Sequence, residues 1–359
     1  MYFMHDDDRK VPHLFGLVAM QPRRLARRLL QTRGTDHSLK SAYQKRWREF
    51  INWIGQKRFP PEADLLDSIR QNIERGTRFY KQLSIEGNLV DGPWMRRCKS
   101  IADDVLHSKD LRLFKHDSLR YSMIVEVGGS WMHSQLDYLS SQLSDETLGE
   151  LLREPRIEGI PVNSIRFGCS HNNIHHLHHL VSFEDCSGIK ISDLRWIVEF
   201  GGGYGNMARL VKMMSPGMTY LIIDLPIFLL IQFAYLETFL GRGICNFVVE
   251  ADQPLEEFKI NLIVGQSNYA IEHEFDLFIS TMALSETSPI AQRAVLEARF
   301  FGAEHLLISH QSTSERWKYA ESFVGPISQQ YEIYLQERLS YFDKDEAYLF
   351  ARKRLARTD

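Results

Sequence analysis

The sequence has few cysteines, and none of them form a recognisable pair. The 359 residues contain no CxxC motif, and the cysteines follow no regular spacing at Cys98, Cys169, Cys186 and Cys245. Zinc sites and disulfide frameworks have closer and more regular cysteine patterns. We therefore interpret the four side chains as reduced thiols of a cytoplasmic protein and predict no metal site.

Long apolar runs are also lacking. The longest, "IFLLIQFAYL" at Ile227–Leu236, is about half the length of a membrane span. The first residues, "MYFMHDDDRKVPHLF", are acidic and contain no apolar stretch of the kind found in secretory signals. We expect no membrane span, and we predict a buried helix at Ile227–Leu236.

The chain carries little net charge. Its formal value of −3 gives no general electrostatic reason to expect nucleic acid or an anionic membrane as a partner. The basic run "RRLARRLL" at Arg23–Leu30 is interpreted as a solvated helix face, with a membrane or nucleic-acid patch as the alternative. We predict no nucleic-acid partner.

The length and composition indicate two folded units. A chain of 359 residues with 44% hydrophobic and 25% charged residues can bury an extensive core and exceeds the usual size of one domain. Apolar residues recur at helical spacing between Lys40 and about Leu113. We expect a mostly helical region over residues 1–186, which forms part of an acceptor pocket or a homodimer interface, and a catalytic domain over residues 187–359.

The second region predicts an α/β fold. Short apolar runs alternate with amphipathic helices from Ile189 onward, which is typical of a parallel sheet. The third strand is either "NFVVEA" or "INLIVG", and two closely spaced strands, "YEIYLQ" and "AYLFARK", end the chain. This order predicts a Rossmann-like, methyltransferase-type sheet of seven mostly parallel strands that ends in an antiparallel hairpin. Another nucleotide-binding α/β fold is the alternative.

Four glycines in five residues mark the turn after the first strand, in "LRWIVEFGGGYGNMARL". Glycine costs roughly 0.5–1 kcal/mol relative to alanine inside regular structure, so such a turn indicates close approach of a ligand to the backbone. Asp224 ends the next strand, where a carboxylate can accept hydrogen bonds from ribose hydroxyls. Glu199 would repel a pyrophosphate but suits an ammonium group. This preference favours S-adenosylmethionine (SAM) over NAD.

The motifs "IVEFGGGYGNMARL", "YLIIDLPIFLLIQFAYLETFLG" and "FDLFISTMALSE" resemble the sugar O-methyltransferase family, a bacterial group of class I SAM-dependent enzymes. The similarity covers roughly Ile189–His310. It implies that the methionine part of SAM is bound by the glycine turn and that Asp224, with its neighbour Leu225, holds the ribose. The residues assigned to the methionine part are Glu199, Gly201, Gly203 and Gly205.

The end of the fourth strand carries further candidates. In "FDLFISTMALSE" at Phe275–Glu286, small and polar residues follow the apolar run, at the strand end that faces cofactor and acceptor in this class of sheet. We assign Ser280 and Thr281 to cofactor binding and Glu286 to catalysis. The alternative is that Glu286 caps the following helix.

Histidines cluster just before the first strand, in "CSHNNIHHLHHL". His171, His175 and His178 lie at i, i+4 and i+7 and share one face of a helix. A histidine near neutral pKa can take the proton of a hydroxyl as it is methylated, so we predict catalytic roles for His175 and His171 and name His310 as a second candidate. Two alternatives stay open, which are a metal half-site and a helix surface with one or two core histidines.

These patterns together predict a cytoplasmic SAM-dependent O-methyltransferase with S-adenosylhomocysteine (SAH) as product. The expected acceptor is a hydroxyl of a sugar, or of a glycosylated or natural-product molecule. Magnesium is possible but not predicted. The alternatives are a binding protein on a degenerate methyltransferase scaffold and an NAD-dependent oxidoreductase, for which no hydride-transfer motif is present.

Overall fold

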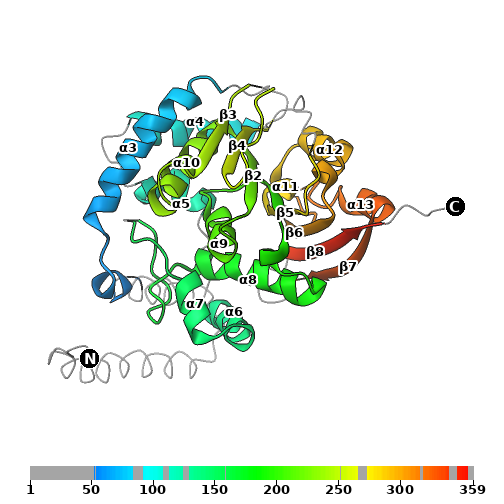
Figure 1. Ribbon diagram of the computed structural model, residues 1–359, viewed down its shortest axis with the longest axis horizontal. Helices are drawn as coiled ribbons and strands as arrows, with labels where there is room; N and C mark the ends of the chain where they lie inside the picture. The colour runs from blue at the N-terminus through cyan, green and yellow to red at the C-terminus, as the bar shows by residue number, and fades with distance from the viewer. Residues whose placement is uncertain are drawn as a thin grey trace. The chain divides into compact units, whose positions relative to one another are not determined.

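The computed structural model describes most of the chain after residue 51 (Figure 1). The described residues are 52, 54–83, 92–107, 113–123, 129–157, 159–250, 252–265, 273–315, 318–338 and 346–354. The basic run Arg23–Leu30 and the first residues lie outside them. Contacts place residues Ile51–Asp359 in one compact unit. The boundary between residues 186 and 187 stays a prediction.

Helices dominate the first part of this unit. Glu62 is the N-cap of α3 (Ala63–Tyr80), and the acidic Asp64 in the first turn of this helix interacts favourably with the positive end of the helix dipole. The helices are α3 (Ala63–Tyr80), α4 (Gly92–His107), η2 (Leu113–Lys115), α5 (Asp117–Met123), α6 (Gly129–Gln142), α7 (Asp145–Leu151) and α8 (His171–Ser187).

The second part alternates strands and helices, as predicted. Its elements are η3 (Ile191–Asp193), β1 (Trp196–Phe200), α9 (Asn206–Met214), β2 (Thr219–Asp224), α10 (Pro226–Phe239), β3 (Cys245–Val248), β4 (Ile260–Val264), β5 (Leu277–Thr281), α11 (Ala283–Glu286), α12 (Pro289–Glu297), η4 (Arg299–Gly302), β6 (His305–Gln311), α13 (Val324–Gln330), β7 (Tyr331–Arg338) and β8 (Glu346–Lys353).

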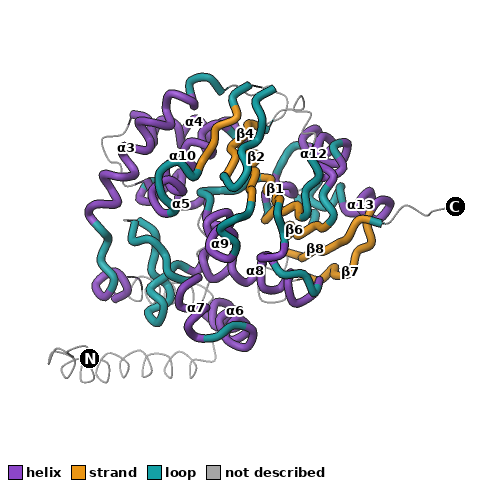
Figure 2. Tube along the Cα trace, in the orientation of Figure 1, coloured by secondary structure: helices purple, strands orange, loops and turns teal. Residues whose placement is uncertain are grey.

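The strands form one sheet in the order β3-β4-β2-β1-β5-β6-β8-β7 (Figure 2). Neighbouring strands are parallel from β3 to β6, whereas β8 runs antiparallel between β6 and β7. This confirms the Rossmann-like, class I methyltransferase-type fold. Both candidates for the third strand are strands, since "NFV" forms the edge strand β3 and "INLIV" forms β4. The sheet therefore has eight strands instead of the expected seven.

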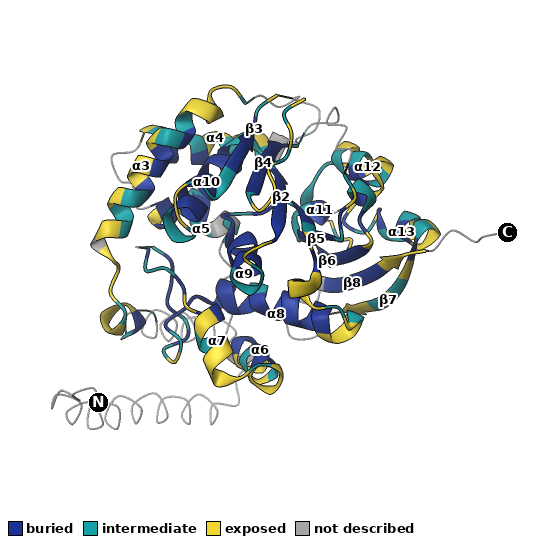
Figure 3. Cartoon of the chain, in the orientation of Figure 1, coloured by how far each residue is buried: buried dark blue, intermediate teal, exposed yellow. Residues whose placement is uncertain are grey.

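Successive residues of the parallel strands pack into two separate hydrophobic cores, one on each face of the sheet. Ile197 packs into the core with α8, α9 and α10, and the next residue, Val198, packs into the core with α11, α12 and α13. Strands that are buried on both faces have continuous apolar sequences, which explains why apolar and polar residues do not alternate in "WIV" and "YLII". The sheet thus lies between two helical layers, and most strand residues are buried (Figure 3).

The predicted buried helix is α10. Its residues from Ile227 to Glu237 are all buried, and α3 packs along it through the Phe79 and Phe233 rings, whose centroids are 6.2 Å apart. Among the described residues, we find no helix that combines the length and the apolar character needed to cross a bilayer.

Candidate functional site

The glycine turn joins the end of β1 to the start of α9. Gly201 and Gly205 have φ of +80° and +95°, a region that L residues rarely adopt. A Cβ at Gly201 would lie 2.1 Å from the Cβ of Ala283 at the start of α11. A Cβ at Gly203, with φ +56°, would meet nothing within 4 Å. The turn is therefore pressed against the end of β5 on one side and open at Gly203.

Glu199 lies beneath this turn with only 1% of its surface exposed. Among the described residues, its only hydrogen-bond donor is the Tyr220 hydroxyl, 3.0 Å from Oε2. Burial raises the pKa of Glu199 to about 8, the Tyr220 hydrogen bond opposes this rise, and the charge of Asp224 adds to it. The carboxyl therefore holds a proton near neutral pH, and a nearby cation would favour its ionisation.

Asp224 ends β2 beside the same turn and is better satisfied than Glu199. It accepts hydrogen bonds from the Leu225 backbone N–H and from Gln232 Nε2, both at 2.7 Å. Burial raises its pKa to about 7, and these two bonds, with the backbone N–H groups of Gly202 and Gly203, oppose the rise. Asp224, the residue predicted to bind the ribose, thus lies next to the glycine turn. The backbone N–H of Leu225 helps to hold the Asp224 carboxyl in place.

Sequence reasoning missed Gln232. Its Nε2 also donates to the Gly203 carbonyl at 3.0 Å, and its Oε1 has no hydrogen-bond partner among the described residues. Gln232 is fully buried on α10 and therefore braces Asp224 against the turn. The signal in the sequence was a single amide within the apolar run "IFLLIQFAYL".

Ser280 and Thr281 end β5. The Ser280 hydroxyl donates to the Phe200 carbonyl at 3.1 Å and accepts from the Leu284 N–H at 3.1 Å, so it ties the end of β1 to α11. The next residue, Met282, has φ +66°, an unusual value for a non-glycine residue, and its N–H donates to the Ser309 carbonyl at 2.7 Å. Such strained residues gather at functional sites, and this one lies beside the turn.

Glu286 and His310 lie near the end of β6. Glu286 is half-buried and accepts a 2.6 Å hydrogen bond from Gln311 Nε2. The N-cap of α12 is Ser288, which accepts from the Ala291 N–H, so Glu286 does not cap that helix. His310 is fully buried, and its Nδ1 lies 3.0 Å from the Gln311 carbonyl oxygen. Ser309 Oγ, His310 Nε2 and Gln311 Oε1 are buried without hydrogen-bond partners in the described part of the chain.

The five clustered histidines all lie on α8, and all but His176 are buried. His171 and His175 share Gln135 of α6, with separations of 3.3 Å to its Oε1 and 2.9 Å to its Nε2. This confirms that both project from one helix face. His175 also packs on Trp131, and burial holds its pKa well below the usual value, with the neighbouring histidines adding to the shift.

The other two buried histidines contact β8. The Tyr348 hydroxyl forms hydrogen bonds with the Nδ1 atoms of both His178 and His179. Burial lowers the pKa of His178 to about 4 and that of His179 well below the usual value. No group of three or more histidine, cysteine, aspartate or glutamate side chains in the described ranges is arranged to hold a metal ion.

A buried polar network links α8 to the helix after the glycine turn. The Arg209 side chain, 2% exposed, donates from Nη2 to Asn173 Oδ1 at 2.7 Å and from Nε to Asn206 Oδ1 at 3.0 Å. Glu154 accepts from the backbone N–H and the hydroxyl of Ser170, the N-cap of α8. The Arg209–Asn173 bond ties α8 to α9, the helix that directly follows the glycine turn.

The structure thus divides the predicted site residues into three groups. The first group is Glu199, Asp224, Leu225 and the glycines at the ends of β1 and β2, with Ser280 and Thr281 at the end of the neighbouring β5. Glu286 and His310 lie near the end of β6. The histidines of α8 contact α6 and β8.

Comparisons with known proteins give matches only among solved structures, since no family model and no curated protein matches. The N-methyltransferase NodS from Bradyrhizobium japonicum WM9, in complex with SAH, is 14% identical over 62% of this chain and 99% of its own, with a TM-score of 0.37. The magnesium protoporphyrin IX methyltransferase ChlM from Synechocystis PCC 6803, with bound SAH, is 10% identical over 50% of this chain and 84% of its own, with a TM-score of 0.38. The small RNA methyltransferase HEN1 is 10% identical over 51% of this chain and 25% of its own, with a TM-score of 0.37.

Proposed function

We propose that the protein is a SAM-dependent methyltransferase. The observation that carries this proposal is the pair of carboxyl groups, Glu199 and Asp224, at the ends of adjacent parallel strands on either side of the glycine turn. Ligands of open α/β sheets bind beyond the carboxyl ends of the strands. Two neighbouring carboxyl groups suit a ligand that brings both an ammonium group, which favours ionisation of the carboxyl beside it, and ribose hydroxyls, which donate hydrogen bonds.

In this assignment, different residues of the chain bind different parts of the cofactor. Glu199 takes the ammonium group of the methionine part, and Asp224 takes the ribose. The backbone at Gly201, Gly203 and Gly205 allows close approach, while Ser280 and Thr281 border the reacting end. When bound, SAM supplies an electrophilic methyl group, and SAH leaves after transfer.

The proposed acceptor is a hydroxyl of a sugar or of a glycosylated or natural-product molecule. The resemblance of the three motifs to the sugar O-methyltransferase family supports it. The buried polar atoms without partners near the end of β6 support an oxygen-rich acceptor at that edge. As the acceptor oxygen bonds to the methyl carbon, the carbon–sulfur bond breaks and the hydroxyl proton passes to a base.

Four residues are proposed as candidates for this base: Glu286, His175, His171 and His310. Glu286 is the most accessible of them, whereas each of the three histidines is buried. Glu286→Gln and His175→Gln should leave SAH affinity intact, and the variant that removes the base should slow turnover by about 10²–10⁴-fold. Turnover at the wild-type rate in either variant would remove that residue from the assignment.

We further propose that residues 1–186 contribute to the acceptor pocket or to a homodimer interface, and that the protein is cytoplasmic. The position of α8, which ends at residue 187 and packs on α9, supports contact between the first region and the cofactor side of the sheet. Size-exclusion chromatography with light scattering tests the dimer.

Calorimetric titration with SAH and, separately, with NAD tests the cofactor assignment. We expect micromolar binding of SAH and none of NAD. Asp224→Ala should weaken SAH binding by about 1–3 kcal/mol, because it removes one or two hydrogen bonds to the ribose. Unchanged affinity would overturn the ribose assignment. If neither ligand binds, the result would favour a binding protein on a degenerate methyltransferase scaffold. If NAD binds, the result would favour an NAD-dependent oxidoreductase.

A further inference from the structure

A cavity of about 530 Å³ lies outside the site described so far, among the helices of the first region. Three cationic side chains line it: Lys57, next to Gln56 in the helical stretch 54–58, Lys115 of η2 and Arg120 of α5. None of the described residues that line it is acidic. Three segments that are distant in sequence therefore bring positive charge to one hollow.

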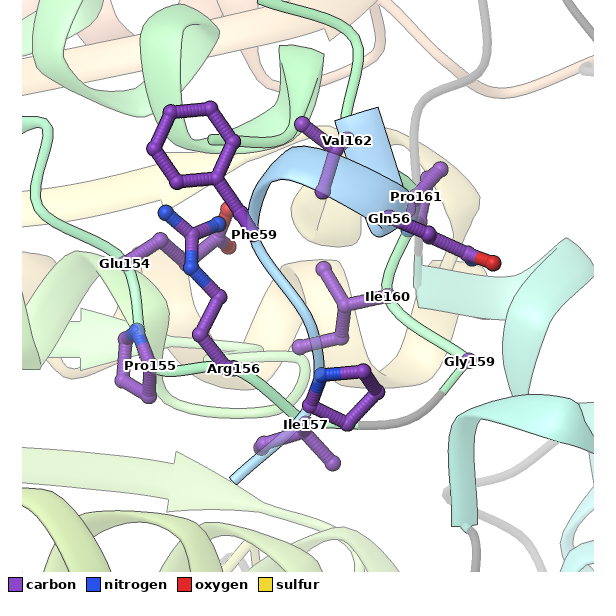
Figure 4. A pocket seen from close by; sticks show the side chains of 11 residues that line it. Gln56, Phe59, Glu154, Pro155, Arg156, Ile157, Gly159, Ile160, Pro161 and Val162 are labelled. Carbon is purple, nitrogen blue, oxygen red and sulfur yellow. The ribbon is translucent and has the colours of Figure 1, made fainter. Parts of the chain in front are cut away.

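The wall of this cavity is held in place by close backbone packing. Gly159 has φ +102°, and a Cβ there would lie 2.4 Å from the Phe114 carbonyl carbon and 2.6 Å from the Lys115 nitrogen. Asn52 Oδ1 accepts the Val162 N–H at 2.9 Å, so the amide oxygen is engaged and the amide nitrogen of this lining residue is a donor. Gln56 and Gly159 also border a second hollow, of about 10 Å³, shown in Figure 4. The lining is thus rich in donors as well as in charge.

The cavity is adjacent to the glycine turn. Phe114, which lines it, packs edge-to-face on Tyr204 with ring centroids 5.1 Å apart. Tyr204 stands between Gly203 and Gly205 in the turn itself. The contact between these two aromatic side chains therefore links the cavity lining to the turn assigned to the cofactor.

We propose that this cavity binds a phosphate or diphosphate group of the acceptor, and that the acceptor is therefore a phosphorylated sugar or a sugar nucleotide. Its volume falls within the range of about 300–1,000 Å³ typical of small-ligand sites. Arginine and lysine are the side chains that recognise phosphate, arginine through paired hydrogen bonds and lysine as a point charge. The inference rests on the proposed methyltransferase function and narrows its substrate class.

A single-stranded RNA is the other phosphate-bearing ligand to consider. RNA binding usually combines a basic groove along the backbone with a series of aromatic side chains on which bases stack. Here the three cations surround one hollow, and Phe114, the aromatic residue of its lining, is fully buried against Tyr204. This arrangement favours a small phosphorylated molecule.

The test is calorimetric titration of the full chain with UDP-glucose, glucose 1-phosphate, pyrophosphate and glucose, each with and without saturating SAH. We expect the three phosphate-bearing probes to bind and glucose to bind at least about tenfold more weakly, because it lacks the charged hydrogen bonds. Lys115→Gln and Arg120→Gln should each weaken the phosphate-bearing probes by about fivefold or more. Lys99→Gln, which changes an exposed lysine of α4 outside the cavity lining, is the matched control.

The outcomes separate this inference from the proposed function. SAH binding with no affinity for pyrophosphate and UDP-glucose would overturn the phosphate site and leave the methyltransferase proposal standing. Pyrophosphate binding without SAH binding would overturn the cofactor assignment, and with it the identification of the ligand as a methyl acceptor. Equal weakening by Lys99→Gln, or tighter binding of a single-stranded RNA oligonucleotide than of UDP-glucose, would also overturn the inference.

Discussion

The glycine turn and helix α8 are both buried and polar, but their titratable groups favour opposite pH ranges. Burial raises the pKa of Glu199 to about 8, so its contribution to folding is fully present below about 4.5, the value taken for the unfolded chain, and is lost as pH rises toward 8. Burial lowers the pKa of His175 and His179, so their contribution is present above about 6.5 and is lost as pH falls.

The buried polar groups of the glycine turn and of α8 also differ in their hydrogen-bond partners. The histidines of α8 share partners supplied by α6 and β8, although His179 Nε2 is buried without one in the described part of the chain. At the turn, Glu199 has one donor among the described residues and Gln232 Oε1 has no partner. Buried polar groups are normally satisfied, so an incomplete set indicates a place for a ligand. At the turn, the unpartnered amide oxygen belongs to the side chain that holds Asp224, and the backbone is open at Gly203, so we expect a ligand there. The shared partners of the α8 histidines hold the helical region onto the sheet.

The largest expected effect comes from filling the turn. Gly201→Val places a branched side chain at φ +80°, where even a Cβ would collide with Ala283. We expect SAH binding to weaken by about 3 kcal/mol or more, which is over a hundredfold, because the turn must move away from β5. Calorimetric titration measures the affinity, and thermal unfolding reports whether the variant folds.

Gly217→Ala is the matched control for this substitution. Gly217 lies just before β2, its φ is not positive, and a Cβ there meets nothing within 4 Å. The control should bind SAH as the wild type does. Wild-type affinity in Gly201→Val would show that the turn does not contact the cofactor, and the contrast between the two regions would lose its functional meaning.

Much of the fold could be predicted from the sequence because parallel strands buried on both faces read as short apolar runs between helices. The runs at β1, β2, β5 and β6 are of this kind. The helix α9 was predictable from its amphipathic spacing. The choice between β3 and β4 could not be made, because both are short apolar runs and β3 lies beside β4 as an extra edge strand. Only the sheet register shows that both are used.

The arrangement of the candidate site was predictable where the backbone demands a residue type, and less so where side chains converge from distant segments. Glycine spacing marked the turn, and strand ends marked Glu199 and Asp224. Gln232 was missed because one amide in an apolar helix gives no hint of its partner, and the cavity near Phe114 was missed because its cations come from three separate segments. Pairing at such distances depends on packing, which local patterns do not encode.

A smaller effect is expected from Glu199→Gln, which tests whether the raised pKa serves ligand binding. At pH 7 the wild-type carboxyl must lose its proton when the SAH ammonium group binds, so binding should release up to one proton, and affinity should rise as pH increases from 6 to 8. The variant should bind about 1.5–3 kcal/mol more weakly at pH 8, because a charged hydrogen bond is lost. Calorimetry in buffers with different ionisation enthalpies counts the protons.

Asp224→Asn serves as the control for that measurement, since the pKa of Asp224 is also raised, to about 7. If Glu199 is the source, proton release persists in Asp224→Asn and disappears in Glu199→Gln. If proton release disappears only in Asp224→Asn, the carboxyl that contacts the ammonium group is Asp224, and our assignment of that contact to Glu199 is wrong. Stability sharpens the result, because apo Glu199→Gln should lose less stability than the wild type between pH 5 and pH 8.

The smallest effect on binding is expected at the contact between α8 and β8, where Tyr348→Phe removes the hydroxyl shared by His178 and His179. We expect a loss of about 1–3 kcal/mol in the free energy of unfolding, because the buried His179 Nδ1 loses its hydrogen bond to the hydroxyl. SAH affinity should stay within about twofold of the wild type, since distant sites are usually independent. Denaturant unfolding and calorimetry measure the two quantities. A variant with wild-type stability and much weaker SAH binding would place α8 in the cofactor site and remove the distinction between the two regions.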